Sequence, residues 1–302
     1  MPEIPHISFY AMGTRSTIVL PGLNDEEADH LFRFIKNEIA RIEGMLSRFI
    51  QESNLSLINA GAAEKPVVVN REMFRILKAA AHYFEKTNGL FDITLRPVLQ
   101  YWKDHPDGDQ KKALDILADL GMNKVRLDER SKTVSFENDR IELDLGGFGK
   151  GYALEKINDL LLRYGLESGF ITFGESSILT LGQHPAGEYW KVGIKNYLEP
   201  EHVVHTYHMR YGSVSTSSNF FVDDNGNLVN HKHVINPRTG VPVEELVTMS
   251  VFSQSAIVAE VFSTALLVMP DKEIDIIVEE YPDIEVLKVT YENDTVEKKL
   301  WD

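Results

Sequence analysis

The feature that most constrains the fold is a glycine-rich segment between a strand-like run and a helix-like run. The segment DLGGFGKG, residues 144–151, carries three glycines at alternate positions after its Gly146. Residues 140–145 favour a strand, and 152–164 favour a helix that Gly165 ends. Glycines allow a ligand to approach the backbone closely, and free N–H groups at a helix start bind phosphate. The segment matches neither the P-loop nor the dinucleotide-binding spacing. It therefore predicts either a phosphate-binding loop or an ordinary tight turn.

Helix and strand signals alternate along the rest of the chain, without a repeat or an evident linker. We expect a strand or hairpin over 7–20, a hairpin over 125–136, and strands over 170–173, 189–194, 203–211 and 248–253. We expect helices after the cap Asn24 and over 71–86, 113–120, 256–269 and 271–281, with a surface excursion over 103–112. This order predicts one intertwined α+β domain over residues 1–302, with mixed or antiparallel sheets flanked by helices.

The charge of the chain excludes some classes of function. The formal net charge is −15, from 46 acidic and 31 basic residues, so the surface repels nucleic acid and we expect no nucleic-acid partner. No run approaches the roughly 20 apolar residues of a membrane span, and the absence of cysteine excludes disulfides and thiolate metal sites. As written, the chain fits the cytoplasm. A removed signal or lipoprotein anchor would instead indicate the periplasm or cell envelope.

The sequence AEVFST places three oxygen-bearing side chains on one helical face. Glu260, Ser263 and Thr264 are spaced i, i+3 and i+4. Oxygen ligands suit magnesium, although such a trio is often only a solvated face. The apolar residues around it indicate a largely buried helix, and a buried carboxylate requires a partner.

Two further polar segments are candidates for chemistry. The run NHKHVINPRTGVPV, residues 230–243, gathers histidine, asparagine and arginine side chains at a stiff turn. The run GSVSTSSNF, residues 212–220, concentrates five hydroxyl groups. Either segment is equally compatible with a turn whose side chains are satisfied locally.

Taken together and in order, these segments resemble the ApbE family of FAD:protein FMN transferases. The resemblance covers nearly the whole chain. The matching pieces are MGT at 12–14, LSRFIQESNLSLIN at 46–59, GLFDIT at 89–94, DLGGFGKGYA at 144–153, STSSNF at 215–220, HVINPRTGVP at 233–242 and the helix carrying 260–264.

The resemblance implies an enzyme that uses Mg²⁺ and transfers FMN from FAD to a Thr or Ser hydroxyl of an acceptor flavoprotein, releasing AMP. Two alternatives are a magnesium-dependent FAD pyrophosphatase, which yields FMN and AMP, and a non-catalytic FAD-binding paralogue. The implied cofactor contacts are Met12, Phe49, Leu90, Phe91, Asp92, Gly146, Lys150, Tyr152, Ile235 and Arg238. The implied magnesium ligands are the Gly149 carbonyl, the Glu260 carboxylate and the hydroxyls of Ser263 and Thr264.

A base must accept the proton of the incoming hydroxyl group. His233 is the first candidate because its reference pKa is near 6.5, and Asp144 is the second. Three of the places where the chain departs from the usual family pattern concern these segments. Glu260 stands where members usually carry Asp, Asn236 replaces the Asp of a DPRTG turn, and Ser218-Asn219 replaces a Gly-Asp pair.

Overall fold

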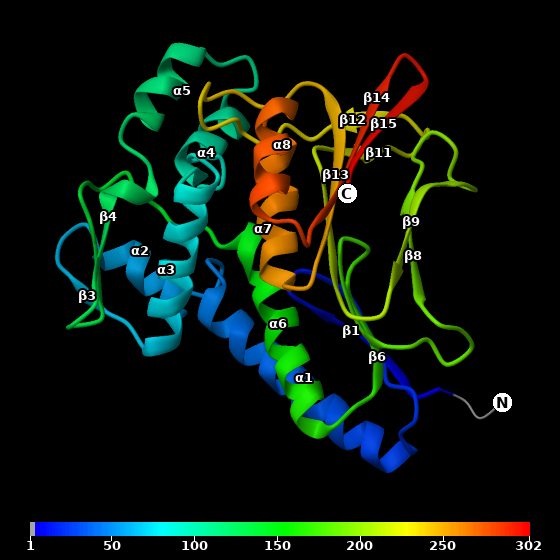
Figure 1. The fold of residues 1–302 in the computed structure, drawn as a ribbon. Helices are drawn as coiled ribbons and strands as arrows, with labels where there is room; N and C mark the ends of the chain where they lie inside the picture. The colour runs from blue at the N-terminus through cyan, green and yellow to red at the C-terminus, as the bar shows by residue number, and fades with distance from the viewer. Residues whose placement is uncertain (1–3) are drawn as a thin grey trace.

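A computed structural model describes residues 4–302 as helices packed against a large antiparallel sheet (Figure 1). The helices are α1 (Asp25–Leu46), α2 (Asn54–Gly61), α3 (Arg71–Lys86), α4 (Arg96–Asp104), α5 (Gln110–Leu117), α6 (Gly146–Tyr164), α7 (Ala256–Leu267) and α8 (Asp271–Glu280). The strands are β1 (His6–Ala11), β2 (Thr14–Val19), β3 (Val67–Val68), β4 (Val125–Asp128), β5 (Thr133–Phe136), β6 (Ser168–Phe173), β7 (Ser177–Gly182), β8 (Trp190–Lys195), β9 (Val203–Met209), β10 (Gly212–Ser218), β11 (Phe220–Val222), β12 (Leu228–Asn230), β13 (Leu246–Ser253), β14 (Glu285–Glu292) and β15 (Thr295–Trp301).

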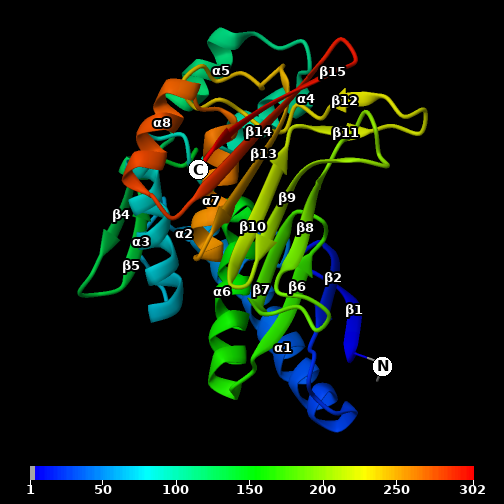
Figure 2. The same ribbon diagram turned by 45° about the vertical axis from the view of Figure 1, so that its right-hand side comes forward.

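The main sheet has eight strands in the order β1-β2-β6-β7-β10-β13-β14-β15. The pairings between these strands are antiparallel. Helices lie along one face, and the β8–β9 ribbon lies on the other (Figure 2). The larger apolar core fills the space between the sheet and helices such as α1, α6 and α7. A smaller core joins β8 and β9 to the opposite face of the sheet. The α+β prediction is confirmed.

The first long helix shows how local sequence fixes an element. The side chain of Asn24 accepts the backbone N–H of Glu27, and the Glu27 carboxylate accepts the N–H of Asn24, which forms a complete capping box. The stripe that includes Leu31, Ile35 and Ile39 is buried, as its helical spacing predicts.

The structure corrects the prediction for the glycine-rich segment. Residues 140–145 form no strand, and their one bridge is isolated, between Leu95 and Glu142. The amide of Asn59 exchanges hydrogen bonds with both backbone groups of Leu143, and the Asp144 N–H donates to the Ile93 carbonyl. Since these groups are satisfied by a side chain and a loop, no neighbouring strand is needed. The glycines that follow are not a turn, because α6 begins at Gly146.

Other elements were not predicted. The segments now seen as α2, α4, β7, β14 and β15 were not expected as helices or strands, and the predicted surface excursion over 103–112 covers the end of α4 and the start of α5. Pro97 lies in the first turn of α4, where proline is tolerated. Within residues 4–302, no helix combines the length and apolar character of a membrane span.

Candidate active site

A cavity of about 560 Å³ opens where the start of α6 meets α7 and the end of β10. Residues between 90 and 96, which lead into α4, and the loop residues 233–235 complete its wall. The structure therefore brings together segments that lie far apart in the sequence. The predicted site residues that line the cavity are Leu90, Phe91, Asp92, Asp144, Gly146, Lys150, His233, Ile235, Glu260 and Thr264.

Helices α6 and α7 make an unusually close contact beside this cavity. A Cβ atom on Gly151 would lie 2.6 Å from the Ala256 carbonyl oxygen and 2.7 Å from the Glu260 Cβ, so only glycine fits. The Glu155 carboxylate of α6 also accepts the N–H of Ala256, the first residue of α7. This contact explains why a glycine-rich sequence is helical here, since packing offsets the low helix propensity of glycine.

Glu260 is the buried charged residue at the centre of the site. Its side chain is only 5% exposed. One carboxylate oxygen lies 3.1 Å from the Lys150 Nζ, and the other accepts hydrogen bonds from the hydroxyls of Ser177 (2.8 Å) and Ser215 (2.9 Å). Lys150 also donates to the hydroxyls of Ser176 (2.9 Å) and Ser177 (2.8 Å). The burial of this carboxylate is therefore compensated by a cation and two hydroxyl donors.

The two hydroxyl residues one turn further along α7 have different surroundings. Ser263 is fully buried, and its hydroxyl bonds the Glu260 carbonyl and the Ser215 hydroxyl. Thr264 also donates to the Glu260 carbonyl, at 3.2 Å, but its side chain lines the cavity. Of the predicted trio, Glu260 and Thr264 thus face the cavity, whereas Ser263 lies against β10.

The Asp144 carboxylate is held by two contacts within the protein. One carboxylate oxygen accepts the N–H of Gly146 at 2.9 Å, and the other lies 2.9 Å from the Arg48 Nε. Its position just before α6 suits an anion, because the N-terminus of a helix carries partial positive charge. Both carboxylate oxygens of Asp144 are therefore already in contact with protein groups.

His233 lines the cavity at an exposed position. Desolvation by the protein atoms around it nevertheless lowers the pKa of His233, and the neighbouring His231 lowers it further. The two rings lie edge to face, with centroids 4.8 Å apart. His233 is consequently neutral at neutral pH, which is the form that accepts a proton.

Asp92 is a second polar group in the cavity wall. Burial raises its pKa, against the opposing effect of two hydrogen bonds from Thr94. The Thr94 N–H and hydroxyl donate to the same carboxylate oxygen, at 2.9 and 2.7 Å. The other oxygen makes no hydrogen bond within residues 4–302 and is available to a ligand.

Comparison with known proteins identifies the family of this chain. The ApbE family model matches residues 12–288, most of the chain. The chain belongs to the ApbE family. Among curated relatives, the FAD:protein FMN transferase of Klebsiella pneumoniae (strain 342) is 26% identical over 293 residues, covering 94% of this chain and 89% of the relative. The FAD:protein FMN transferase of Escherichia coli (strain K12) is 26% identical over 313 residues, covering 99% and 87%.

Solved structures show that this ApbE-family chain has the same fold. The ApbE protein from Thermotoga maritima MSB8 superimposes with a TM-score of 0.84 at 24% identity, covering 98% of this chain and 97% of the other. The flavin transferase ApbE from Vibrio cholerae gives a TM-score of 0.83 at 23% identity, covering 99% and 97%. Both the family prediction and the fold prediction are confirmed.

Four predicted residues of this ApbE-family chain lie outside the cavity but near it or within its supporting helices. Gly149 lies inside α6, where a Cβ atom would be 3.4 Å from the Met12 side chain. Phe49 is 78% exposed, and the guanidinium of Arg48 stacks on its ring at 3.9 Å. Because Arg48 also pairs with Asp144, Phe49 lies close to the mouth of the cavity. The fourth residue is the buried Ser263.

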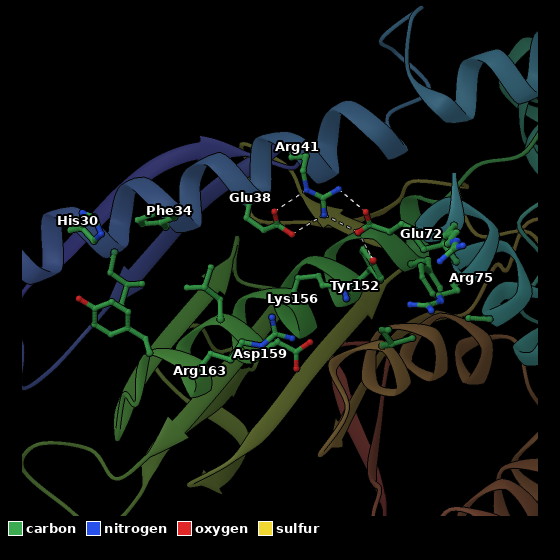
Figure 3. Close-up of a pocket in the computed structure, with 18 residues that line it drawn as sticks. His30, Phe34, Glu38, Arg41, Glu72, Arg75, Tyr152, Lys156, Asp159 and Arg163 are labelled. Atoms are coloured by element: carbon green, nitrogen blue, oxygen red, sulfur yellow. Dashed lines mark hydrogen bonds and ion pairs between the residues drawn. The ribbon is translucent and has the colours of Figure 1, made fainter. Parts of the chain in front are cut away.

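Two predicted cofactor contacts are directed elsewhere. The Tyr152 hydroxyl donates to the Glu72 carboxylate at 2.6 Å, and its ring lines a different cavity (Figure 3). The Arg238 guanidinium makes two 2.6 Å hydrogen bonds to Glu273 of α8. Both side chains are therefore occupied by protein partners, and their roles in flavin binding stay predictions.

The departures from the family pattern have structural roles of their own. The Asn236 side chain accepts the N–H of Arg238 at 2.9 Å, so the turn is closed as an aspartate would close it. Asn219 donates from its amide to the carbonyls of Val243 and Glu245, and it accepts the N–H of Val247. An aspartate at position 219 would lack those donors.

Sequence reasoning missed the serines that bond Glu260 and Lys150. Ser176 and Ser177 lie in a segment that we had not singled out, and Ser215 belonged to a hydroxyl run that we had left undecided. The alternation of β10 was the available signal, since Ser213, Ser215 and Ser217 lie on one face of the strand and Val214 lies on the other.

Proposed function

We propose that this chain transfers FMN from FAD to a Thr or Ser hydroxyl of an acceptor flavoprotein and releases AMP. Membership of the ApbE family and the names of its relatives support this activity. The observation that carries the proposal is the buried Glu260–Lys150 pair in the wall of a cavity that begins at the N-terminus of α6. One wall thus offers a carboxylate for a cation and an ammonium for a phosphate.

The residues present fit a magnesium ion that arrives with phosphate. Within residues 4–302, no three His, Asp or Glu side chains gather as a metal-binding group. Mg²⁺ is usually held by one or two carboxylates together with substrate phosphates and water. Glu260 and Thr264 are the ligands that the geometry supports best, while Ser263 and Gly149 remain predicted ligands. When bound, the metal would neutralise charge on the pyrophosphate and on the leaving AMP.

Lys150 supplies positive charge that belongs to the chain itself. Its ammonium group has three donors, which now bond Ser176, Ser177 and Glu260. Since its side chain lines the cavity, we propose that it turns from Glu260 to a phosphate oxygen when a metal ion satisfies the carboxylate. Before the substrate binds, the ion pair with Lys150 would compensate the charge of Glu260.

The acceptor hydroxyl oxygen attacks the phosphorus of the FMN half, and the bond from that phosphorus to the AMP oxygen breaks. The hydroxyl proton must leave during this attack. His233 is the proposed acceptor of this proton, because its ring is neutral and faces the cavity. Asp144 is retained as a structural anion that orders the start of α6 and holds Arg48.

The test is incubation of the protein with FAD, Mg²⁺ and a purified acceptor flavoprotein lacking flavin, followed by mass spectrometry. A covalent FMN adduct on the acceptor with release of AMP supports transfer. Free FMN and AMP without an adduct would indicate a pyrophosphatase, in which water replaces the acceptor hydroxyl. FAD binding with neither product would indicate a flavin-binding paralogue. We also propose that residues 1–302 form a single domain, so the assay uses the full chain.

A further inference from the structure

A second cavity, of about 1120 Å³, lies between α1, α3 and α6 (Figure 3). Phe148, Tyr152, Lys156, Asp159 and Arg163 line it from α6. Their spacing of three or four residues places them on one helical face. The residues of α6 that line the active-site cavity, Gly146, Gly147 and Lys150, lie on the opposite side of the helix. Apart from Tyr152, whose flavin contact stays a prediction, no predicted site residue lines this larger cavity.

Part of the charge in this cavity is balanced internally. The Arg41 guanidinium bonds Glu38 at 2.8 Å and Glu72 at 2.7 Å, and Tyr152 donates to Glu72 (Figure 3). These hydrogen bonds to Arg41 are the main reason that the pKa values of Glu38 and Glu72 are lowered, and the charge of Lys156 lowers both further. The two carboxylates are thus compensated by Arg41 and Lys156.

The remaining charge in the cavity is positive and lacks protein partners. Five basic and three acidic side chains line the cavity, in a chain whose formal net charge is −15. Arg71, Arg75 and Arg163 form no ion pair within residues 4–302, and the one carboxylate left, Asp159, forms none either. Guanidinium groups collected in a concave site, within an otherwise acidic protein, favour an anionic ligand, above all phosphate.

The cavity also offers aromatic surface. Phe34 is 52% exposed and Tyr164 is 45% exposed, although both are large and apolar side chains. The volume of about 1120 Å³ slightly exceeds the roughly 300–1,000 Å³ typical of small-molecule sites and is more than a single phosphate requires. A ligand that matches both the rings and the guanidinium groups carries a flat aromatic part and phosphate groups.

We propose that this second cavity binds a nucleotide, with its phosphates on Arg75 and Arg163 and its base against Phe34. The site is separate from the active site, and its existence does not depend on the proposed transfer activity. Arg71 extends the same basic surface one turn before Arg75 on α3.

The test is calorimetric titration of the full chain with ADP, with and without FAD present to occupy the active site. We expect an ADP site that persists when FAD is bound. The substitutions Arg75→Glu and Arg163→Glu should each weaken ADP binding at least tenfold. Arg33→Glu is the matched control, because Arg33 is exposed on α1 and does not line the cavity. Arg75→Ala is the milder variant if a charge reversal impairs folding.

A second titration with inorganic pyrophosphate separates the base from the phosphates. Phe34→Ala should weaken the binding of ADP and leave that of pyrophosphate unchanged. Absence of ADP binding that is weakened by Arg75→Glu and Arg163→Glu, at millimolar concentrations with and without FAD, would overturn the proposal. Equal weakening by Arg33→Glu would also overturn it, because the effect would then be one of net charge. If FAD itself fails to bind, the transfer proposal falls while the ADP titrations still decide this one.

Discussion

Replacing Lys150 with methionine should lower the free energy of unfolding, because the buried Glu260 carboxylate loses its cationic partner. The substitution removes the 3.1 Å ion pair and the two hydrogen bonds to Ser176 and Ser177. Removing one partner of a buried ion pair costs about 3–5 kcal/mol. Lys150 is 23% exposed and Glu260 keeps its two serine donors, so we expect a smaller loss, about 2–3 kcal/mol.

Thermal unfolding followed by circular dichroism measures this loss. At about 2 °C or slightly more per kcal/mol for a chain of this size, the melting temperature should fall by roughly 4–8 °C. Lys112→Met is a matched control, because Lys112 is exposed on α5 and makes no side-chain bond within residues 4–302. Added Mg²⁺ should restore more stability to Lys150→Met than to the unmodified protein, since an external cation then replaces the ammonium.

The double variant Lys150→Met/Glu260→Gln completes the thermodynamic cycle. Neutralising the carboxylate should recover part of the lost stability, with a coupling energy of about 1–3 kcal/mol between the two positions. A melting temperature for Lys150→Met that matches the control would refute the reasoning. So would a double variant that is less stable than the sum of the two single changes predicts.

Three further predictions concern the site and its packing. Glu260→Ala should reduce magnesium-dependent turnover more than FAD binding, and turnover unchanged by this substitution would remove Glu260 from the metal site. Because the pKa of His233 is lowered, the rate of transfer should not fall as the pH drops through the ordinary value near 6.5, but only at lower pH, when the ring gains its proton. A pH–rate profile of His233→Gln should lack that acid limb, and an unchanged profile would assign the base elsewhere. Gly151→Ala should destabilise the protein by about 1–3 kcal/mol, because its Cβ would overlap α7. The control Gly44→Ala, on the open face of α1, should be neutral or stabilising. Equal melting temperatures for the two variants would contradict this prediction.

Long periodic segments were predictable from the sequence because burial of one regularly spaced apolar face determines their structure. The capped helix after Asn24 and the helix over 71–86 follow from their apolar spacing, and both are confirmed. The segment 140–145 has the composition of a strand, but the amide of Asn59 satisfies the backbone of Leu143 in place of a neighbouring strand. Nothing local to the run shows that a side chain more than 80 positions away has this role.

The site was predictable in its segments and not in its contacts. Spacing alone placed Glu260 and Thr264 on one helical face, and the structure brings both to the cavity. The choice of Lys150 as the partner of Glu260 depends on the contact between α6 and α7, which only the folded chain defines. Tyr152 lies two residues after Lys150 on α6, about half a turn further around the helix. Its ring therefore lines the other cavity.

The order of the elements along the chain also sets when the site can form during synthesis. The carboxylate of Glu260 meets the Ser177 hydroxyl across 83 positions of chain, and α7 follows β13, the strand beside β10. A nascent chain therefore displays Lys150 and its serines before the counter-charge on α7 exists. Any product that ends before α7 lacks the Glu260 carboxylate, so a prematurely terminated chain leaves the Lys150 ammonium without its ion-pair partner.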